Sequence, residues 1–525
     1  MMSMKEIEKR LWDTADELRA NSGLRPSEYS RPVLGLLFLK FADTRFAKVE
    51  EKLKPKPGSR IRPGPDEYKA HGAIYLTPQS RFDWLNQLPE DADLGKELNN
   101  AMEQIERDNP DLADALPKSF AEIPKDTLLE LLRLLEPLDL SGDTFGQVYE
   151  YFMGEFAKAT MEKGGEFYTP SSIVRLIVEI IEPYEGRVYD PACGSGGMFA
   201  HSADFVARHR REPGKALSVY GIEKTRETLR LMKMNLAMHG IGGQVSEANS
   251  YYEDPYDSVG KFDFVMANPP FNVDKVDKTK LKKDVRGEEV IDARFPFGLP
   301  TADNANYLWI SLFFSALNDE GRAGFVMANS ASDARGSEAE IRKKLIDTGA
   351  VDVIAAVGPN MFTTVTLPCT LWFYDKGKIG TEREGEVLFI DARNMFRQVT
   401  RAFRDFEDWQ IEALANIVRL WRQTDPELNW ASDAWLKERF DAEGGDGLVY
   451  RDVAGLCRAV SREEIEKQGW SLNPGRYVGV TEREDDGVDF RERLTELQAE
   501  LEELNTEARE LDIAIARSVA DILEA

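Results

Sequence analysis

The sequence predicts a doubly wound α/β domain, in which parallel strands alternate with helices that cover both faces of the sheet. Between residues 187 and 390, short apolar runs typical of buried strands alternate with segments of helical periodicity. Four polar or acidic residues directly follow such runs: Asp190, Glu223, Asn249 and Asn268. Because ligands of these sheets bind at the carboxyl ends of the strands, we expect the four side chains to share one site.

The bulk composition indicates a soluble globular protein of roughly two to four domains. Of its 525 residues, 42% are apolar and 30% are charged, and no apolar run is long enough to suggest a membrane span. The three cysteines and four histidines show no metal-ligand spacing, so we expect no metal site and a reducing, cytoplasmic location. The net charge of −26 argues against strong unaided binding to nucleic acid, unless a partner supplies positive surface.

Residues 1–145 are predicted to form a helical domain. Apolar residues recur at helical spacing over 4–18, 33–46 and 80–140, whereas 54–66 is rich in Pro, Gly and Lys and indicates a loop. The segment contains no pattern with an evident chemistry, so a scaffold or interface role is favoured.

A helix predicted over 144–157 leads to the sequence Gly164-Gly165-Glu166-Phe167-Tyr168-Thr169-Pro170. Thr169 or Ser171 is placed to cap the following helix, with Pro170 near its first turn. A cap alone would explain Thr169 and Pro170, but not the glycine pair and the two aromatic residues before them.

The first strand of the α/β unit leads into a glycine-rich turn and then a helix, over Asp190-Pro191-Ala192-Cys193-Gly194-Ser195-Gly196-Gly197. Glycines let a backbone approach a ligand closely and turn with positive φ. The second strand, 218–222, ends in Glu223, where an acidic residue is placed to bind ribose hydroxyls. A purely structural turn and a solvated strand end are the alternatives, but together the two features favour a nucleoside-containing cofactor.

The elements that follow continue the alternation. Residues 225–239 are predicted to form a helix ended by Gly240, and 244–248 a weak strand before Asn249. After the strand that precedes Asn268, strands are expected at 325–329, 351–357, 371–374 and 387–390, with helices near 304–318 and 337–347.

The tetrapeptide Asn268-Pro269-Pro270-Phe271 follows the apolar run 262–266 and ends that strand, because a Pro pair cannot continue it. The Asn268 side-chain oxygen and the Pro269 carbonyl can both accept hydrogen bonds from an exocyclic NH2 group, and Phe271 can stack on a ring. The alternative is a strand-ending turn without function.

Basic residues cluster in the predicted loop 272–300. In a chain this acidic such a run is unusual, and its place directly after the proposed ring pocket favours contact with a DNA backbone over a solvated loop. The candidate DNA-contact residues are Lys275, Lys278, Lys280, Lys282, Lys283 and Arg286.

The C-terminal part of the chain is predicted to be helical. Residues 401–470 combine helices and loops, with Trp409, Trp421, Trp430 and Trp435 packed inside. In the tail, a heptad seam that needs a partner helix runs through Leu494, Leu497, Leu501, Leu504, Ala508, Leu511, Ile515, Ser518 and Ile522.

Three of these segments, 166–170, 190–199 and 268–271, together resemble the motifs of amino-group DNA methyltransferases in their gamma order. With the helical front, the stretch 304–309, the turn 473–477 and the tail, the chain resembles the methylation subunit of a type I restriction-modification system over nearly its whole length. The resemblance implies a doubly wound S-adenosylmethionine-dependent methyltransferase sheet. The expected domains are 1–145 (N-terminal helical), 146–400 (catalytic), 401–485 (C-terminal extension) and 486–525 (helical assembly tail).

The resemblance also implies roles for single residues. Asn268, Pro269, Pro270 and Phe271 would hold an extruded adenine, whose N6 attacks the sulfonium methyl group directly. Where members of the family often have Gly-Asp-Thr, this chain has Ala248-Asn249-Ser250, and Asn can still bind the adenine of the cofactor. The residues expected to bind S-adenosylmethionine are Glu166, Phe167, Tyr168, Thr169, Pro170, Ser171, Asp190, Ala192, Gly194, Ser195, Gly196, Gly197, Glu223 and Asn249.

The implied activity is site-specific methylation of adenine N6 in DNA. The implied partners are double-stranded DNA, a specificity subunit that reads the target sequence, a second methylation subunit and a restriction subunit. Two alternatives stay open: an N5-glutamine protein methyltransferase, which presents a similar Asn-Pro-Pro-aromatic sequence, and a catalytically silent assembly subunit. The helical front, basic loop and tail count against the first, and the intact tetrapeptide with Glu223 counts against the second.

Overall fold

The computed structural model describes residues 26–54, 63–138, 148, 152, 169–285, 288–362, 368–400, 403–442, 447–480 and 498. The chain divides into two compact units, Met1–Gly479 and Val480–Ala525. The helix predicted at 4–18 lies outside the described residues, and so do nearly all of the helix at 144–157 and the heptad tail. Among the helices that are described, none is both long enough and apolar enough to cross a bilayer.

The N-terminal part of the first unit is helical, as predicted. In α5 (Leu94–Asp108), Leu94, Leu98, Met102 and Ile105 recur every three or four residues and are all buried, so they form one apolar face. The other elements of this part are α2 (Pro26–Lys52), α3 (Pro65–Ala70), η1 (Pro78–Ser80), α4 (Phe82–Asn86), η2 (Pro110–Leu112), η3 (Phe120–Glu122) and α6 (Lys125–Leu135).

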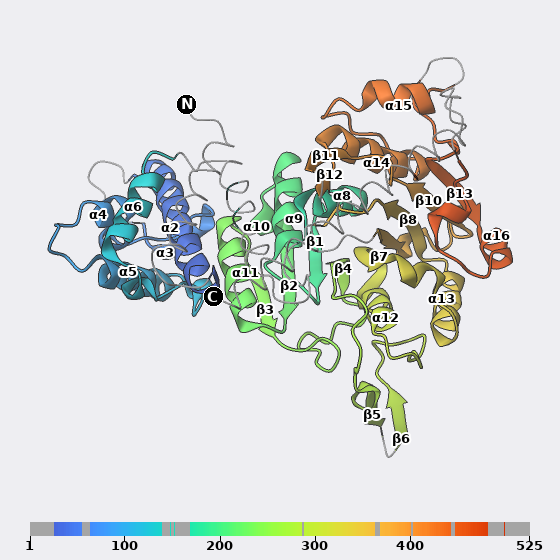
Figure 1. The fold of residues 1–525 in the computed structure, drawn as a ribbon, viewed down its shortest axis with the longest axis horizontal. Coiled ribbons are helices and arrows are strands. Elements are labelled where there is room, and N and C mark those ends of the chain that lie inside the picture. Colours follow the sequence, from blue (N-terminus) through green and yellow to red (C-terminus); the bar gives the residue numbers. More distant parts are fainter. Residues whose placement is uncertain are drawn as a thin grey trace, which may run out of the picture. The chain divides into compact units, whose positions relative to one another are not determined.

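A nine-stranded sheet follows, in the order β13-β10-β8-β9-β7-β4-β1-β2-β3 (Figure 1). β9 and β13 run antiparallel to their neighbours, and every other neighbouring pair is parallel. The chain order reverses between β1 and β4, which is where doubly wound sheets bind their ligands. The strands are β1 (Gly186–Asp190), β2 (Leu217–Glu223), β3 (Gly243–Glu247), β4 (Phe262–Ala267), β7 (Leu317–Ala328), β8 (Val351–Val357), β9 (Cys369–Asp375), β10 (Glu386–Asp391) and β13 (Cys457–Ser461).

Alternate residues of the strands enter two separate cores, one on each face of the sheet. On β9, Leu371 and Phe373 join the first core, whereas Trp372 and Tyr374 join the second. The first face is covered by α8 (Ser171–Ile181), α9 (Gly197–Arg208), α11 (Arg226–Met238) and α14 (Asp408–Trp421), and the second by α12 (Asn306–Ala316) and α13 (Ser337–Asp347). The predicted doubly wound α/β class is therefore confirmed.

The segment after residue 400 differs from the prediction of helices and loops only. β13 pairs antiparallel with β10 and adds an edge strand to the main sheet. A five-residue edge strand among polar residues has too little apolar alternation to be recognised from sequence. The four tryptophans are buried or half-buried, as predicted. The remaining short elements are α10 (Pro213–Ala216), η4 (Lys278–Leu281), β5 (Lys282–Val285), β6 (Glu288–Ile291), η5 (Asn329–Asp333), η6 (Lys376–Lys378), β11 (Arg397–Thr400), β12 (Phe403–Asp405), α15 (Asp433–Phe440), α16 (Arg462–Lys467) and η7 (Pro474–Arg476).

Candidate active site

Four neighbouring parallel strands bring predicted site residues together at the carboxyl ends of the strands. β1 ends at Asp190 and β2 at Glu223, while Asn249 follows β3 and Asn268 follows β4. The strands are adjacent in the order β4-β1-β2-β3, so their carboxyl ends lie side by side. The backbone N–H of Gly194 donates to Glu223 Oε2 at 3.2 Å and joins the glycine-rich turn to the end of β2.

The glycine-rich turn between β1 and α9 has a shape that other residues rarely adopt. Gly194 and Gly196 have φ of 52° and 82°, in the left-handed region. A Cβ on Gly196 would lie 3.0 Å from Met232 Cγ. Asn235 Nδ2 donates to the Ser195 carbonyl at 3.0 Å, so α11 holds the turn from behind. These contacts fix the shape of the turn. Because three of its four residues are glycines, few side-chain atoms would separate its backbone from a ligand.

Asp190 and Glu223 are poorly hydrated carboxylates. Burial raises the pKa of Asp190 well above its usual value, although the Ala192 N–H donates to its Oδ1 at 2.9 Å; the neighbouring Glu223 raises it further. Burial also raises the pKa of Glu223, against hydrogen bonds from the Thr225 and Gly194 N–H groups. No cation in the described part of the chain offsets either carboxylate. A ligand that brings hydroxyl groups and positive charge fits this pair.

Asn249 shapes the loop after β3. Its Oδ1 accepts from the Tyr251 N–H at 3.1 Å, and its own N–H donates to Glu253 Oε1 at 2.8 Å. Ser250 Oγ donates to the Pro191 carbonyl at 2.5 Å and ties this loop to the turn after β1. An Asp at position 249 would accept the same bond from residue 251, so the loop keeps its shape with Asn.

The tetrapeptide 268–271 follows β4 at the same carboxyl end of the sheet. Asn268 Nδ2 donates to Thr169 Oγ1 at 3.0 Å, whereas Asn268 Oδ1 is buried and has no hydrogen-bond partner among the described residues. Pro269 is buried, and Phe271 is half-buried against the first core. Because a buried acceptor without a donor costs free energy, this oxygen is prepared to accept from a bound group.

Directly after Phe271 the chain turns at Asn272, a non-glycine residue with φ of 54°. Buried Asn306, the first residue of α12, holds this turn. Its Oδ1 accepts from the Asn272 N–H at 2.9 Å, and its Nδ2 donates to Asn272 Oδ1 at 2.9 Å. Asn304 Nδ2 donates to the same oxygen at 3.1 Å. Sequence reasoning missed this role, because Asn residues before a helix are also ordinary caps and point to no distant partner.

The segment before α8 corrects one prediction. Neither Thr169 nor Ser171 caps this helix: its N-cap residue is Pro170, which has no side-chain capping hydrogen bond, and no other side chain in the described part of the chain bonds to the first turn. The Thr169 hydroxyl is engaged by Asn268 instead. Glu166, Phe167 and Tyr168 lie outside the described residues.

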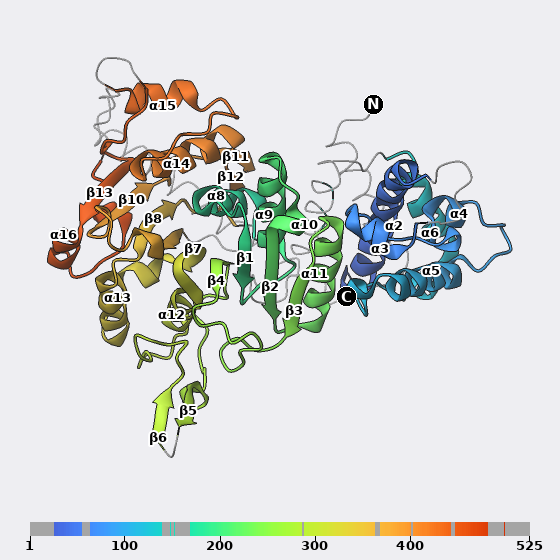
Figure 2. The same ribbon diagram turned by 180° about the vertical axis from the view of Figure 1, so that it is seen from behind.

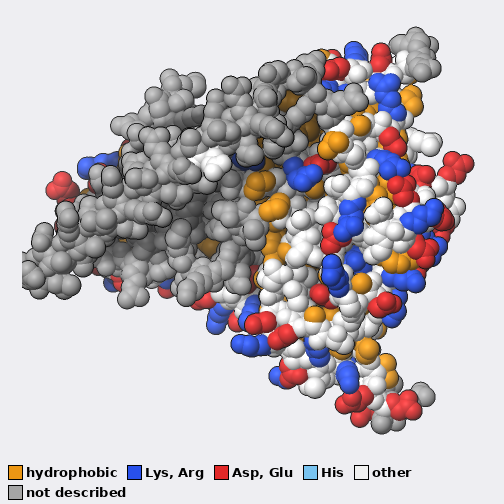
Figure 3. Space-filling model, turned by 45° about the vertical axis from the view of Figure 1, so that its right-hand side comes forward, with side chains coloured by type: hydrophobic (Ala, Val, Ile, Leu, Met, Phe, Trp, Pro, Cys, Tyr) orange, Lys and Arg blue, Asp and Glu red, His pale blue; other side chains and the backbone are white. Residues whose placement is uncertain are grey.

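Residues 272–300 are predicted to be a loop, but they contain the projecting β5–β6 hairpin (Figure 1). Of the predicted DNA-contact residues, Lys282 and Lys283 lie on β5, and Lys278 and Lys280 lie in η4 just before it. Residues 272–300 contain seven basic and six acidic residues, so their net charge is only +1. Figure 3 likewise shows Lys and Arg interspersed with Asp and Glu on its visible face. Among the described residues, four of these lysines form ion pairs: Lys275–Asp274 at 4.0 Å, Lys280–Asp277 at 3.8 Å, Lys282–Glu289 at 3.0 Å and Lys283–Asp292 at 3.0 Å. Lys278 Nζ donates to the Ala302 carbonyl at 2.8 Å. Arg286 lies outside the described residues, and DNA contact by this segment stays a prediction.

Arg294 is a further residue that sequence reasoning missed. Its guanidinium is buried, with Nη2 at 3.0 Å from Asp292 Oδ2 and Nη1 donating to the carbonyls of Ser250 at 2.9 Å and Glu253 at 3.0 Å. Burial by itself would raise the pKa of Asp292, but hydrogen bonds from Arg294 and Lys283 outweigh it and lower the pKa to about 2. This pair joins the loop after β3 to the base of the hairpin.

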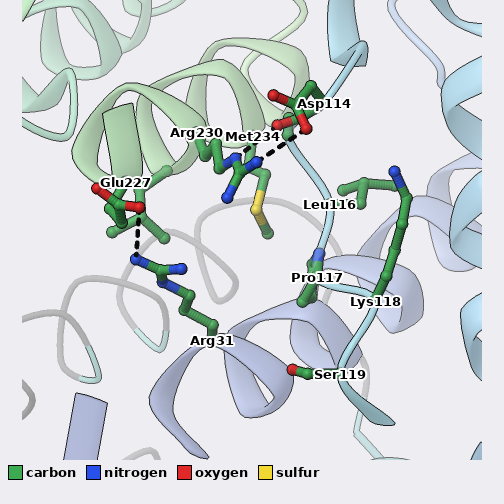
Figure 4. Close-up of a pocket in the computed structure, with 11 residues that line it drawn as sticks. Arg31, Asp114, Leu116, Pro117, Lys118, Ser119, Glu227, Arg230 and Met234 are labelled. Carbon is green, nitrogen blue, oxygen red and sulfur yellow. Dashed lines mark hydrogen bonds and ion pairs between the residues drawn. The ribbon is translucent and has the colours of Figure 1, made fainter. Parts of the chain in front are cut away.

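A separate cavity of about 230 Å³ lies where the N-terminal helices meet α11 (Figure 4). Its charged groups are paired: Arg31 lies 3.8 Å from Glu227, and Arg230 lies 2.8 Å from Asp114. Met234 of α11, which also lines the cavity, belongs to the core of the N-terminal helices. Figures 1 and 2 both show these helices beside α11 and β3. None of the predicted site residues lines this cavity, so we interpret it as part of a structural junction.

Comparison with known proteins identifies the family. Residues 140–486 match the family model described as N-6 DNA Methylase. The chain belongs to this family. Residues 7–135 of the methylase match a second model, described as the HsdM N-terminal domain.

Relatives of the methylase cover most of its length. It is 33% identical to the type I restriction enzyme MjaIX methylase subunit of Methanocaldococcus jannaschii, over 99% of this chain and 91% of that one. It is 34% identical to the type I restriction enzyme HindI methylase subunit of Haemophilus influenzae, over 82% of this chain and 93% of that one. The resemblance to type I methylation subunits is therefore confirmed.

A solved structure shares the fold. The type I restriction-modification methyltransferase subunit from Streptococcus thermophilus superimposes with a TM-score of 0.69 at 22% sequence identity. The match covers 91% of this chain and all of that one.

Proposed function

We propose that the methylase transfers a methyl group from S-adenosylmethionine to N6 of adenine in DNA, as the modification subunit of a type I restriction-modification complex. The observation that carries the proposal is the buried Asn268 oxygen without a partner among the described residues, beside the strand-end carboxylates. An acceptor in this place suits a substrate whose reacting group is an NH2.

The residues at the strand ends suit the proposed cofactor. S-adenosylmethionine would supply a methyl group on a positively charged sulfur. Glu223 has backbone N–H groups on both oxygens and lone pairs left for ribose hydroxyls. Asp190 adds a second buried carboxylate whose pKa a cationic ligand would lower. The turn at Gly194–Gly197 leaves room for close approach, and Asn249, which follows β3, would contact the adenine ring of the cofactor.

The tetrapeptide would act on the extruded adenine. Asn268 Oδ1 and the Pro269 carbonyl would accept hydrogen bonds from the two N6–H groups and draw that nitrogen toward tetrahedral geometry, which localises its lone pair. As N6 gains the methyl group, the bond from that group to sulfur would break, and one N6 proton would be released to solvent. Phe271 would stack on the base. Orientation and preorganised acceptors would supply the acceleration, and no covalent bond to the protein is needed.

The partners follow from the family and from the charge of the chain. The relatives from Methanocaldococcus jannaschii and Haemophilus influenzae are named methylase subunits of type I restriction enzymes. With a net charge of −26, this chain needs another subunit to provide positive surface for DNA. A specificity subunit, a second methylation subunit and a restriction subunit are the partners we infer.

Transfer of labelled methyl groups tests the function. The methylase is incubated with radiolabelled S-adenosylmethionine and either duplex DNA or a protein extract, each with and without its specificity subunit. We expect label in N6-methyladenine of DNA only when the specificity subunit is present. Label in glutamine of a protein would favour the N5-glutamine alternative, and no label in any arm would indicate a silent assembly subunit.

A further inference from the structure

Thr169 lies two residues before the first residue of α8, and its side chain does not cap that helix. Its hydroxyl accepts a hydrogen bond from Asn268 Nδ2 at 3.0 Å, across 99 residues of sequence. Among the described residues this is the hydrogen bond that the Asn268 amide makes through its nitrogen, whereas its oxygen has none.

This bond holds one end of the Asn268 amide. A carboxamide has an acceptor end and a donor end of nearly the same shape, and rotation about its last bond exchanges them. With its nitrogen engaged by Thr169, the oxygen is the end that remains for the pocket. A substrate amino group is a donor, so the reverse orientation would set two donors against each other.

We propose that Thr169 is a positioning residue: its hydroxyl fixes the plane of the Asn268 amide and acts on methyl transfer, not on cofactor binding. The inference rests on the proposed function, because it needs Asn268 to accept from the substrate. It departs from the contact with S-adenosylmethionine that the resemblance implies for Thr169.

The test compares three variants in the complex assembled with the specificity subunit. Thr169→Val replaces the hydroxyl by a methyl group, and Thr169→Ser keeps the hydroxyl. Ser172→Ala is the matched control, because Ser172 lies three residues further on, in α8, and its Oγ is buried without a hydrogen-bond partner among the described residues. For each variant, kcat, the KM for DNA and the Kd for S-adenosylmethionine by calorimetry are measured.

We expect Thr169→Val to lower kcat by about 10- to 100-fold, since a misplacement of about 1 Å costs on the order of 100-fold. The KM for DNA and the Kd for the cofactor should stay within about twofold of wild type, and Thr169→Ser should restore most of kcat. Ser172→Ala should behave as wild type. If Thr169→Val does not fold in thermal unfolding, Thr169→Ala must show the same selective loss of kcat.

Three results would overturn the inference: a Kd for the cofactor raised tenfold with kcat preserved at saturation, equal losses in Thr169→Val and Thr169→Ser, or Thr169→Val indistinguishable from Ser172→Ala. The wild-type arm separates this from failure of the proposed function. A wild-type complex that binds S-adenosylmethionine but leaves DNA adenine unmodified would refute the function itself.

Discussion

Asn268 is the residue whose side chain the proposed methyl transfer requires most directly. Asn268→Ala removes the buried acceptor at the end of β4 and leaves the strand-end carboxylates in place. Methyl transfer should fall by more than about 1000-fold, because a preorganised group that contacts the reacting atoms supplies a large part of the acceleration. The Kd for S-adenosylmethionine, measured by calorimetry, should stay near wild type. Near-normal turnover would refute the assignment of the adenine pocket.

Asn306 acts on the turn that directly follows the tetrapeptide. Asn306→Ala removes both hydrogen bonds to Asn272 and releases a turn with positive φ directly after Phe271. We expect kcat to fall about tenfold or more through misplacement of the stacking ring, and the free energy of unfolding to fall by about 1–3 kcal/mol. Asn304→Ala, which removes one longer bond to Asn272 and the cap of the Asn306 N–H, is the control and should have a smaller effect on kcat. Equal effects of the two variants would contradict this ranking.

At the scale of single elements, the ion pairs of the β5–β6 hairpin determine how many of its lysines are available to bind DNA. Lys282 and Lys283 already have Glu289 and Asp292 as partners. If the hairpin touches the DNA backbone, reversing the charge of Lys280, Lys282 and Lys283 should weaken DNA binding by the assembled complex. For every phosphate that the hairpin no longer neutralises, the slope of log K against log salt should become shallower by about 0.9. Glu289→Gln, which frees Lys282, should shift affinity in the opposite direction. Unchanged slopes in both variants would mean a solvated loop.

The Asp292–Arg294 pair at the base of the hairpin makes the stability of the folded protein depend on pH. The pKa of Asp292 is lowered to about 2 from a usual value of 3.8, so its contribution is present above pH 3.8 and is lost as the pH falls toward 2. The difference corresponds to about 2 kcal/mol. Asp292→Asn should therefore lower the thermal midpoint at pH 7, and the gap to wild type should narrow between about pH 4 and pH 2. A gap independent of pH would show that the carboxylate charge is not what holds this loop.

On the scale of the whole molecule, the tail is predicted to join the chain to its partner. Each seam leucine contributes roughly 1.5–3 kcal/mol when buried, so an unpaired seam would be prone to association. Residues Met1–Gly479 form a compact unit without it. Deletion of residues 490–525 should leave a folded protein that binds S-adenosylmethionine but no longer assembles with the specificity subunit or methylates DNA. Size-exclusion chromatography and calorimetry check this.

The outcome that would contradict this prediction is a loss within the isolated chain. A lower thermal midpoint or weaker cofactor binding in the truncated protein, before any partner is added, would show that the tail packs on its own chain.

The sequence by itself determined the fold class and the residues at the strand ends. Apolar alternation, helical periodicity and the Pro pair after 262–266 are local signals, because they depend on neighbours a few residues away. Parallel strands that each end in a polar residue then place Asp190, Glu223, Asn249 and Asn268 together through the topology alone. The domain boundaries have no local signal of comparable strength, and they stay a prediction.

Only the tertiary structure decided which side chains hold that site in shape. Thr169 meets Asn268 across 99 residues, Asn306 meets Asn272 across 34, and Arg294 meets the Ser250 carbonyl across 44. β13 joins the sheet beside β10 in the same way. Each of these residue types also has an ordinary local use, as a cap, a surface charge or a loop residue, so its presence in the sequence does not point to a distant partner. A hydrogen bond between distant residues leaves no periodicity in the chain, because its geometry exists only after the strands have packed.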